Sequence, residues 1–200
     1  MTRHVLGLAL CAAVTAGPAF AQTKPGGIVA VGGSVTEIIF ALGASDRVVA
    51  RDSTSTFPRD AETLPDIGYM RALSPEGVLS VDPQLIVAEE GAGPPETIAV
   101  LNAADIDFVT VPEQFSAEGI ATKVRVVGEA IGEPAKARVL ADRIVEELAA
   151  VTAKSRELTG EKKRVMFVLS TQGGRIMASG TDTAPASMIA MAGAQNAVTA

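Results

Sequence analysis

Short apolar runs alternate with amphipathic segments along the first half of the chain, beginning at residue 28. Four of these runs are rich in branched or aromatic residues and are typical of buried strands: residues 28–31, 47–50, 85–88 and 107–111. The segments between them predict helices over residues 34–43, 75–81 and 94–104. Because strands and helices that alternate in this way form parallel sheets covered by helices, the pattern predicts an α/β fold.

Polar residues mark the beginnings of two of these helices. Ser34 is followed three residues later by Glu37, which is the spacing of a capping box, and Gly43 is placed to end the same helix. The sequence Ser74-Pro75-Glu76 is typical of a helix start, with proline in the first turn and an acid beside the positive end of the helix dipole. Each signal supports a helix that the hydrophobic pattern already predicts.

The pattern changes after residue 114, where two helical stripes of apolar residues follow one another. The stripes consist of Ile120, Val124, Val127 and Ile131, and of Leu140, Ile144, Leu148 and Val151. Pro134 is well placed to start the second helix, which extends to about residue 158 and is long for a globular domain. Residues 164–169 resume the pattern of a buried strand, and Gly173-Gly174-Arg175 predicts a hairpin turn.

These elements predict two α/β lobes joined by a long spine helix. We expect an N-terminal lobe over residues 22–115, a helical connector over 116–160 and a C-terminal lobe over 161–200. Segment 191–200 echoes segment 41–50, because each has a helix end, a glycine cap and the start of a strand. The second lobe has far fewer predicted elements than the first, and we therefore expect it to be incomplete.

The first 21 residues have the features of a cleavable secretory signal. Arg3 gives a positive start, residues 5–16 form an apolar run too short to span a bilayer, and a small-residue cleavage site ends at Ala21. The only histidine and the only cysteine, His4 and Cys11, both lie in this segment. Cleavage would leave no thiol for a disulfide and no histidine for a catalytic set. We expect a soluble, exported protein that is not an enzyme.

The charge of the chain bears on its partners. Its formal net charge is −6 at pH 7. Proteins that bind nucleic acids present basic surfaces to the phosphate backbone, so an acidic exported chain argues against a nucleic acid as partner. The two-lobe plan instead suits a protein that captures a small ligand between its lobes.

Tyr69 is the only tyrosine, and it is one of few remaining side chains that could hold a metal, together with carboxylates and methionines. It follows Gly68 in a turn just before a helix, where sites are often built, and Arg71 is near enough in sequence to stabilise a phenolate. A lone tyrosine near a loop is more often a half-buried packing residue with its hydroxyl in water. Arg71 also fits a solvated surface charge, and Glu76 fits a favourable first-turn acid. The residues alone leave these interpretations open.

Several segments together resemble periplasmic haemin-binding proteins, the substrate-binding components of bacterial haemin ABC transporters. The similar segments are 28–42 with Thr36-Glu37, 69–79, 82–87, 90–95 and 171–196. The Gly-Tyr-x-Arg motif at residues 68–71, followed by Glu-Gly-Val-Leu-Ser at 76–80, is specific within the broader class of helical-spine binding proteins. That class also includes proteins that carry cobalamin and siderophores.

The resemblance implies two Rossmann-like lobes joined by one long helix, with haem held between them. It implies Tyr69 as the axial ligand to ferric haem iron and Arg71 as a hydrogen-bond donor to the phenolate. Glu76 and Asp182 are the implied docking acids, one on each lobe, that meet arginines of the membrane permease. Some family members add a histidine ligand from the second lobe, and this chain has none there, so we expect a single protein ligand on iron.

Further contacts and alternatives complete the set of expectations. Thr54, Ser55 and Arg175 are candidates to hold the haem propionates, and the binding unit is expected to be a monomer. The first alternative is a cobalamin or ferric-siderophore binder of the same architecture, in which Tyr69 only stacks on the ligand. The second is a fragment that binds nothing because its second lobe is incomplete.

Overall fold

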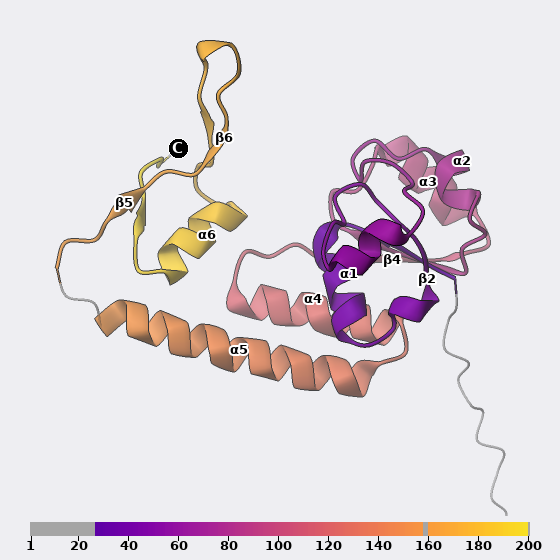
Figure 1. The fold of residues 1–200 in the computed structure, drawn as a ribbon, viewed down its shortest axis with the longest axis horizontal. Helices are drawn as coiled ribbons and strands as arrows, with labels where there is room; N and C mark the ends of the chain where they lie inside the picture. The colour runs from indigo at the N-terminus through magenta and orange to yellow at the C-terminus, as the bar shows by residue number, and fades with distance from the viewer. Residues whose placement is uncertain (1–26, 158–159, 200) are drawn as a thin grey trace, which may run out of the picture.

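The N-terminal part of the molecule is built on a four-stranded parallel sheet, shown in Figure 1 for the computed structural model, which describes residues 27–157 and 160–199. The strands follow the order β2-β1-β3-β4. They are β1 (Ile28–Val31), β2 (Val48–Arg51), β3 (Leu85–Glu89) and β4 (Asp107–Val111). All four predicted strands are confirmed, with boundaries that differ by one residue at most. The predicted signal peptide over residues 1–21 lies outside the described residues.

Helices cover both faces of this sheet, and a hydrophobic core lies on each side. The covering helices are α1 (Gly33–Ala41), α2 (Pro75–Leu79), α3 (Pro95–Ala103) and α4 (Ala117–Ala130). Ile28 and Ala30 of β1 belong to the core beneath α1 and α4, whereas Val29 and Val31 belong to the core beneath α2 and α3. Because neighbouring strand residues point to opposite faces, a strand covered on both sides is apolar throughout. This explains the unbroken apolar run of β1.

The start of α1 differs from the prediction. The helix begins at Gly33 after Gly32, without a side-chain cap, so the predicted capping box of Ser34 and Glu37 is wrong. The Ser34 hydroxyl instead donates a hydrogen bond of 2.8 Å to Glu89 on a neighbouring strand. The predicted start of α2 is confirmed, because the Ser74 hydroxyl accepts a 3.0 Å hydrogen bond from the Gly77 amide.

The long helix α5 (Pro134–Glu157) runs along one side of the molecule, below both the sheet and the C-terminal segment in Figure 1. It packs against α4 at Gly128, where an added Cβ would lie 2.1 Å from the Ala137 Cβ. Only a glycine therefore allows this close approach. The predicted stripes are only partly buried, since Val151 is exposed and Ile120 is partly so, while Ala137 and Ala141 are fully buried. Within the described residues, no helix is both long enough and apolar enough to cross a membrane.

The C-terminal segment contains short strands and one helix. Its elements are β5 (Arg164–Val165), β6 (Val168–Ser170), η3 (Gln172–Gly174), β7 (Met177–Ala178), α6 (Ala184–Met191) and β8 (Gln195–Asn196). Strands β6 and β7 form an antiparallel hairpin, so the predicted turn at Gly173-Gly174 is confirmed. The single buried strand predicted over residues 164–169 is wrong, because two short strands replace it and its apolar side chains are exposed. This segment contributes little to either hydrophobic core.

The echo between the two parts has a structural counterpart. Strand β2 pairs in parallel with β1 after the α1 helix, and β8 pairs in parallel with β5 after the α6 helix. Two short 3₁₀ helices, η1 (Ser45–Arg47) and η2 (Arg59–Thr63), complete the N-terminal part. The chain thus has the mixed α/β architecture that the sequence predicts, and the predicted domain boundaries stay predictions.

Candidate functional site

The carboxyl ends of the four parallel strands bring their loops to one edge of the sheet. From β1 the chain moves to β2 on one side of it, and from β2 it crosses back to β3 on the other side of β1. The strand order therefore reverses between β1 and β3. Open α/β sheets bind ligands at the carboxyl edge beside such a reversal. The loops at this edge contain Thr54, Ser55 and the Tyr69 turn, and the edge is therefore the candidate site.

Asp52 organises the loop that follows β2. Its carboxylate is fully buried and accepts hydrogen bonds from the Gly32 amide at 2.9 Å, from the Thr54 amide at 2.9 Å and from the Thr54 hydroxyl at 2.7 Å. It also accepts a 2.7 Å hydrogen bond from the Ser55 hydroxyl. A buried carboxylate is stable only when such donors replace its water. Asp52 therefore fixes the β2 loop against the loop that follows β1.

Ser55 is not a ligand contact in this arrangement. Its side chain is fully buried, and its hydroxyl lies between Asp52 and the Thr36 hydroxyl, 2.7 Å from each. The sequence prediction that Ser55 holds a propionate is wrong, because the side chain points into the protein and is already hydrogen-bonded. Thr54 is exposed beside it, so it remains a candidate contact.

Tyr69 lies in an adjoining turn. The Ser53 amide donates a 2.9 Å hydrogen bond to the Gly68 carbonyl, which joins the β2 loop to this turn. Gly68 has φ +98, a conformation that favours glycine, and its amide donates to the Asp66 carboxylate at 2.8 Å. The Tyr69 side chain is 49% exposed. The turn is thus anchored by its backbone, while the phenol is accessible to a ligand.

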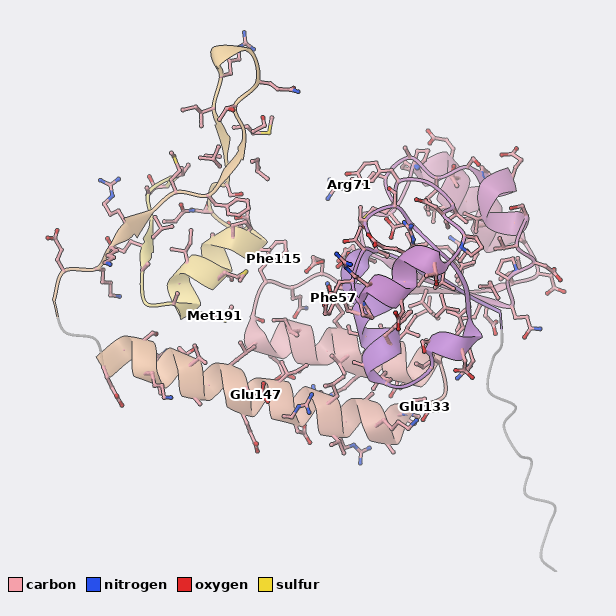
Figure 2. The ribbon with its side chains drawn as sticks, in the orientation of Figure 1. Phe57, Arg71, Phe115, Glu133, Glu147 and Met191 are labelled. Carbon is pink, nitrogen blue, oxygen red and sulfur yellow. The ribbon has the colours of Figure 1, made fainter. Side chains whose placement is uncertain are left out.

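Arg71 is also exposed. It projects from the sheet lobe, the part of the molecule built on strands β1 to β4, on the side that faces the C-terminal segment, as Figure 2 shows. Among the described residues, no hydrogen bond joins its guanidinium to the Tyr69 hydroxyl. Arg175, the other predicted cationic contact, is exposed directly after η3 in the separate hairpin. The structure therefore brings Thr54 and Tyr69 onto adjoining loops but does not join Arg175 to them.

The two predicted docking acids lie on different parts of the molecule. Glu76 is exposed in the first turn of α2. Asp182 is exposed with φ +54 and directly precedes Thr183, whose hydroxyl caps the start of α6. Both carboxylates are therefore accessible to a partner protein.

Sequence reasoning missed an ionic cluster at the same edge of the sheet. The Lys123 ammonium on α4 donates to Glu89 at 2.5 Å, to Glu113 at 2.8 Å and to the Ser34 hydroxyl at 3.1 Å. The Lys123 side chain is only 8% exposed and that of Glu89 14%. Glu89 is thus largely buried, whereas the neighbouring Glu90 is exposed. Lys123 interrupts the apolar face of α4 beside Val124, which is a sequence signal for a buried ionic partner.

The cluster shifts the pKa values of its members. Burial opposes the charged form of Lys123, but hydrogen bonds to Glu113 and Glu89 outweigh it, so the pKa of Lys123 lies above its ordinary value. Burial and the neighbouring Glu89 raise the pKa of Glu113. Burial also disfavours the charged form of Glu89, yet hydrogen bonds from Glu113 and Lys123 hold its pKa below the ordinary value. The ion pair of Lys123 and Glu89 is therefore favoured at neutral pH.

Other features of the molecule do not compete as metal centres. Within the part of the chain that the structure describes, no group of three His, Cys, Asp or Glu side chains could hold a metal ion. A cavity of about 730 Å³ lies between the end of α5 and α6, away from Tyr69, and is lined by Thr152, Ser155 and Gly193 among others. The accessible phenol of Tyr69 therefore remains the most distinctive candidate ligand.

The chain is similar to known binding proteins. The model of the family described as "Periplasmic binding protein" matches residues 28–200. The periplasmic haem-binding protein RhuT from Roseiflexus sp. RS-1 is 38% identical with a TM-score of 0.81, and the match covers 86% of this chain and 65% of that one. A periplasmic haem-binding protein from Pseudomonas aeruginosa is 28% identical with a TM-score of 0.80, over 88% of this chain and 64% of its own.

A third relative is named for a different ligand. The vitamin B12-binding protein of Vibrio parahaemolyticus is 26% identical over 147 residues, which are 72% of this chain and 51% of the relative. The chain therefore spans between about half and two thirds of the length of these three relatives.

Proposed function

Because this chain belongs to the periplasmic binding protein family, whose members bind substrates for transporters, we propose that it captures ferric haem in the periplasm and delivers it to the permease of an ABC transporter. The observation that carries the proposal is the half-exposed phenol of Tyr69, on an anchored turn at the carboxyl edge of a parallel sheet. The similarity to two haem-binding proteins over most of this chain supports haem as the ligand.

Tyr69 suits ferric iron for a chemical reason. Its phenolate is a hard anionic oxygen, and tyrosine is a known axial ligand of haem iron. The exposure of the side chain lets the oxygen reach an iron atom outside the lobe. Arg71 follows two residues later and is exposed, so its guanidinium can turn toward a bound phenolate and donate a charge-assisted hydrogen bond.

Delivery requires a second contact surface, and the exposed acids Glu76 and Asp182 fit that role. Each carboxylate is accessible, and neither lies on the Tyr69 turn. Complementary charges speed the encounter of proteins and fix their orientation. We therefore assign these two acids to contacts with arginines of the permease, while Thr54 and Arg175 are the remaining candidates to hold the haem propionates.

The experiment is a haemin titration of the full chain followed by visible spectroscopy. The wild type is expected to show the bands of a tyrosinate-bound ferric haem. Tyr69→Phe keeps the ring but removes the oxygen, so these bands should disappear, and Tyr69→His should give an imidazole-type spectrum instead. Wild-type bands that persist unchanged in Tyr69→Phe would remove Tyr69 from the iron site.

Cobalamin is the second candidate ligand, because a vitamin B12-binding protein is among the relatives. In that case Tyr69 would stack on the ligand without bonding to a metal, and a ferric siderophore would be held in a similar way. A fluorescence titration with haemin in the presence of excess cyanocobalamin separates these functions. Displacement of haemin by cobalamin, with no tyrosinate bands, would favour the alternative.

A chain that binds none of these ligands is the remaining possibility. Ligands that bind only the folded state raise the melting temperature. A thermal melt of the chain with and without haemin is therefore expected to shift upward. A melt that haemin leaves unchanged, together with an unchanged spectrum, would identify a non-binding chain.

A further inference from the structure

Phe57 is a second exposed aromatic residue at the carboxyl edge of the sheet. Its side chain is 64% exposed, more than that of Tyr69 at 49%. Single exposed apolar residues are common on protein surfaces, so exposure by itself assigns no role. The location of Phe57 and the hydrogen bonds that hold its loop indicate whether the exposed ring has a role.

The loop that presents Phe57 is held on both sides. Before it, Ser55 is fully buried and donates to the buried carboxylate of Asp52. After it, the Pro58 carbonyl accepts a 2.8 Å hydrogen bond from the amide of Ala61, which is also fully buried. Phe57 therefore lies between two anchors, and its exposed position is fixed by the surrounding structure.

The same loop is joined to the Tyr69 turn. The hydrogen bond from the Ser53 amide to the Gly68 carbonyl connects the two segments, one residue before Tyr69. Figure 2 shows Phe57 on the side of the sheet lobe that faces the C-terminal segment, the same side as Arg71. The two exposed aromatic side chains thus come from joined loops at one edge of the sheet.

We infer that Phe57 supplies an aromatic contact surface for the ligand beside the oxygen of Tyr69. This inference rests on the proposed function, and it narrows the ligand to a flat, apolar macrocycle. A porphyrin has two flat faces that gain affinity from contact with aromatic rings, independently of any metal. Phe57 therefore contributes to the recognition of the ring, whereas Tyr69 recognises the iron.

The test uses haemin and metal-free protoporphyrin IX with the full chain. Phe57→Ala is expected to weaken binding of both probes about tenfold, the order expected when a ligand no longer buries one aromatic side chain. Its haemin complex should keep the tyrosinate bands. Tyr69→Phe should lose those bands but bind protoporphyrin IX as the wild type does. Phe57→Leu retains apolar area and should show an intermediate loss.

Val139→Ala is the matched control, because Val139 is 71% exposed on α5 and belongs to a different part of the molecule. It should bind both probes as the wild type does. Melting temperatures of Phe57→Ala and of the control should equal that of the wild type, since both side chains lie on the surface.

The outcomes separate the two proposals. If the wild type binds haemin with tyrosinate bands and Phe57→Ala binds both porphyrins as tightly as the wild type, the role of Phe57 is overturned while the proposed function stands. If the wild type binds neither porphyrin, the proposed function fails, and the role of Phe57 fails with it. A tenfold loss of porphyrin affinity in Phe57→Ala, smaller in Phe57→Leu and absent in Val139→Ala, supports the inference.

Discussion

Gly43 and Gly193 hold the same position at the ends of helices α1 and α6, in two separate parts of the molecule. Their φ angles are +72 and +77. The residue after each glycine donates a backbone hydrogen bond into the preceding helix, from Ala44 at 3.1 Å and from Ala194 at 3.0 Å. The left-handed glycine satisfies the last carbonyls of each helix. The echo between the two sequences therefore reflects one repeated helix-end geometry.

The two glycines differ in their surroundings, and this difference gives a stability prediction. A Cβ at Gly193 would lie 3.0 Å from the Ser155 carbonyl oxygen, whereas a Cβ at Gly43 would meet only the flexible end of Lys136 at 4.0 Å. Gly43→Ala should cost about 1 kcal/mol from the left-handed backbone alone. Gly193→Ala should cost about 2 kcal/mol, because the contact with α5 is added.

Hydrogen–deuterium exchange measures both changes locally. Amides of α6 should exchange about thirtyfold faster in Gly193→Ala, and amides of α1 about fivefold faster in Gly43→Ala. Equal effects at the two sites would show that α6 does not pack on α5 through Gly193.

Removal of Lys123 should destabilise the first lobe strongly. Lys123→Met keeps the length of the side chain but leaves the largely buried carboxylate of Glu89 without its cation. Breaking a buried ion pair in this way costs about 3 kcal/mol. Urea denaturation at pH 7 measures the loss. Arg143→Met is the control, because the Arg143–Glu147 pair is exposed and should contribute less than about 0.5 kcal/mol.

The ion pair of Lys123 and Glu89 also predicts a loss of stability in alkaline solution. The pKa of Lys123 lies above its ordinary value of 10.5, so the folded state holds this proton more tightly than the unfolded state does. The stabilisation is therefore fully present below pH 10.5 and decreases as the pH rises through the folded-state pKa. The difference in unfolding free energy between wild type and Lys123→Met should be constant from about pH 7 to 9 and shrink above 10.5. A difference that does not change with pH would contradict the assignment.

Arg71 should affect haemin binding without affecting the fold. Its side chain is exposed, so Arg71→Ala should leave the melting temperature unchanged. Loss of a charge-assisted hydrogen bond to the bound phenolate is expected to weaken haemin binding about tenfold and to move the tyrosinate bands. A spectroscopic titration measures both effects. Arg59→Ala removes another exposed arginine of the same lobe and should bind as the wild type does.

The sequence predicted the central strands β1 and β3 of the first sheet well because both are buried on both faces. Such strands are apolar throughout, so a continuous apolar run is sufficient to find them, as β1 illustrates. The same reasoning failed at residues 164–169, where an apolar run forms two short, exposed strands. An apolar run indicates a tendency to be buried, but the neighbouring elements decide whether it is covered.

In the candidate site, too, local sequence determined some features and tertiary packing determined others. The sequence by itself determined that Tyr69 follows a glycine in a turn before α2, because Gly68, Ser74 and Pro75 act through local backbone geometry. Only the tertiary structure decided that the Ser55 hydroxyl is buried against the Thr36 hydroxyl and that Lys123 meets Glu89 at the sheet edge. These contacts join residues far apart in sequence, and their partners are chosen by the packing of strands and helices, for which no local pattern exists.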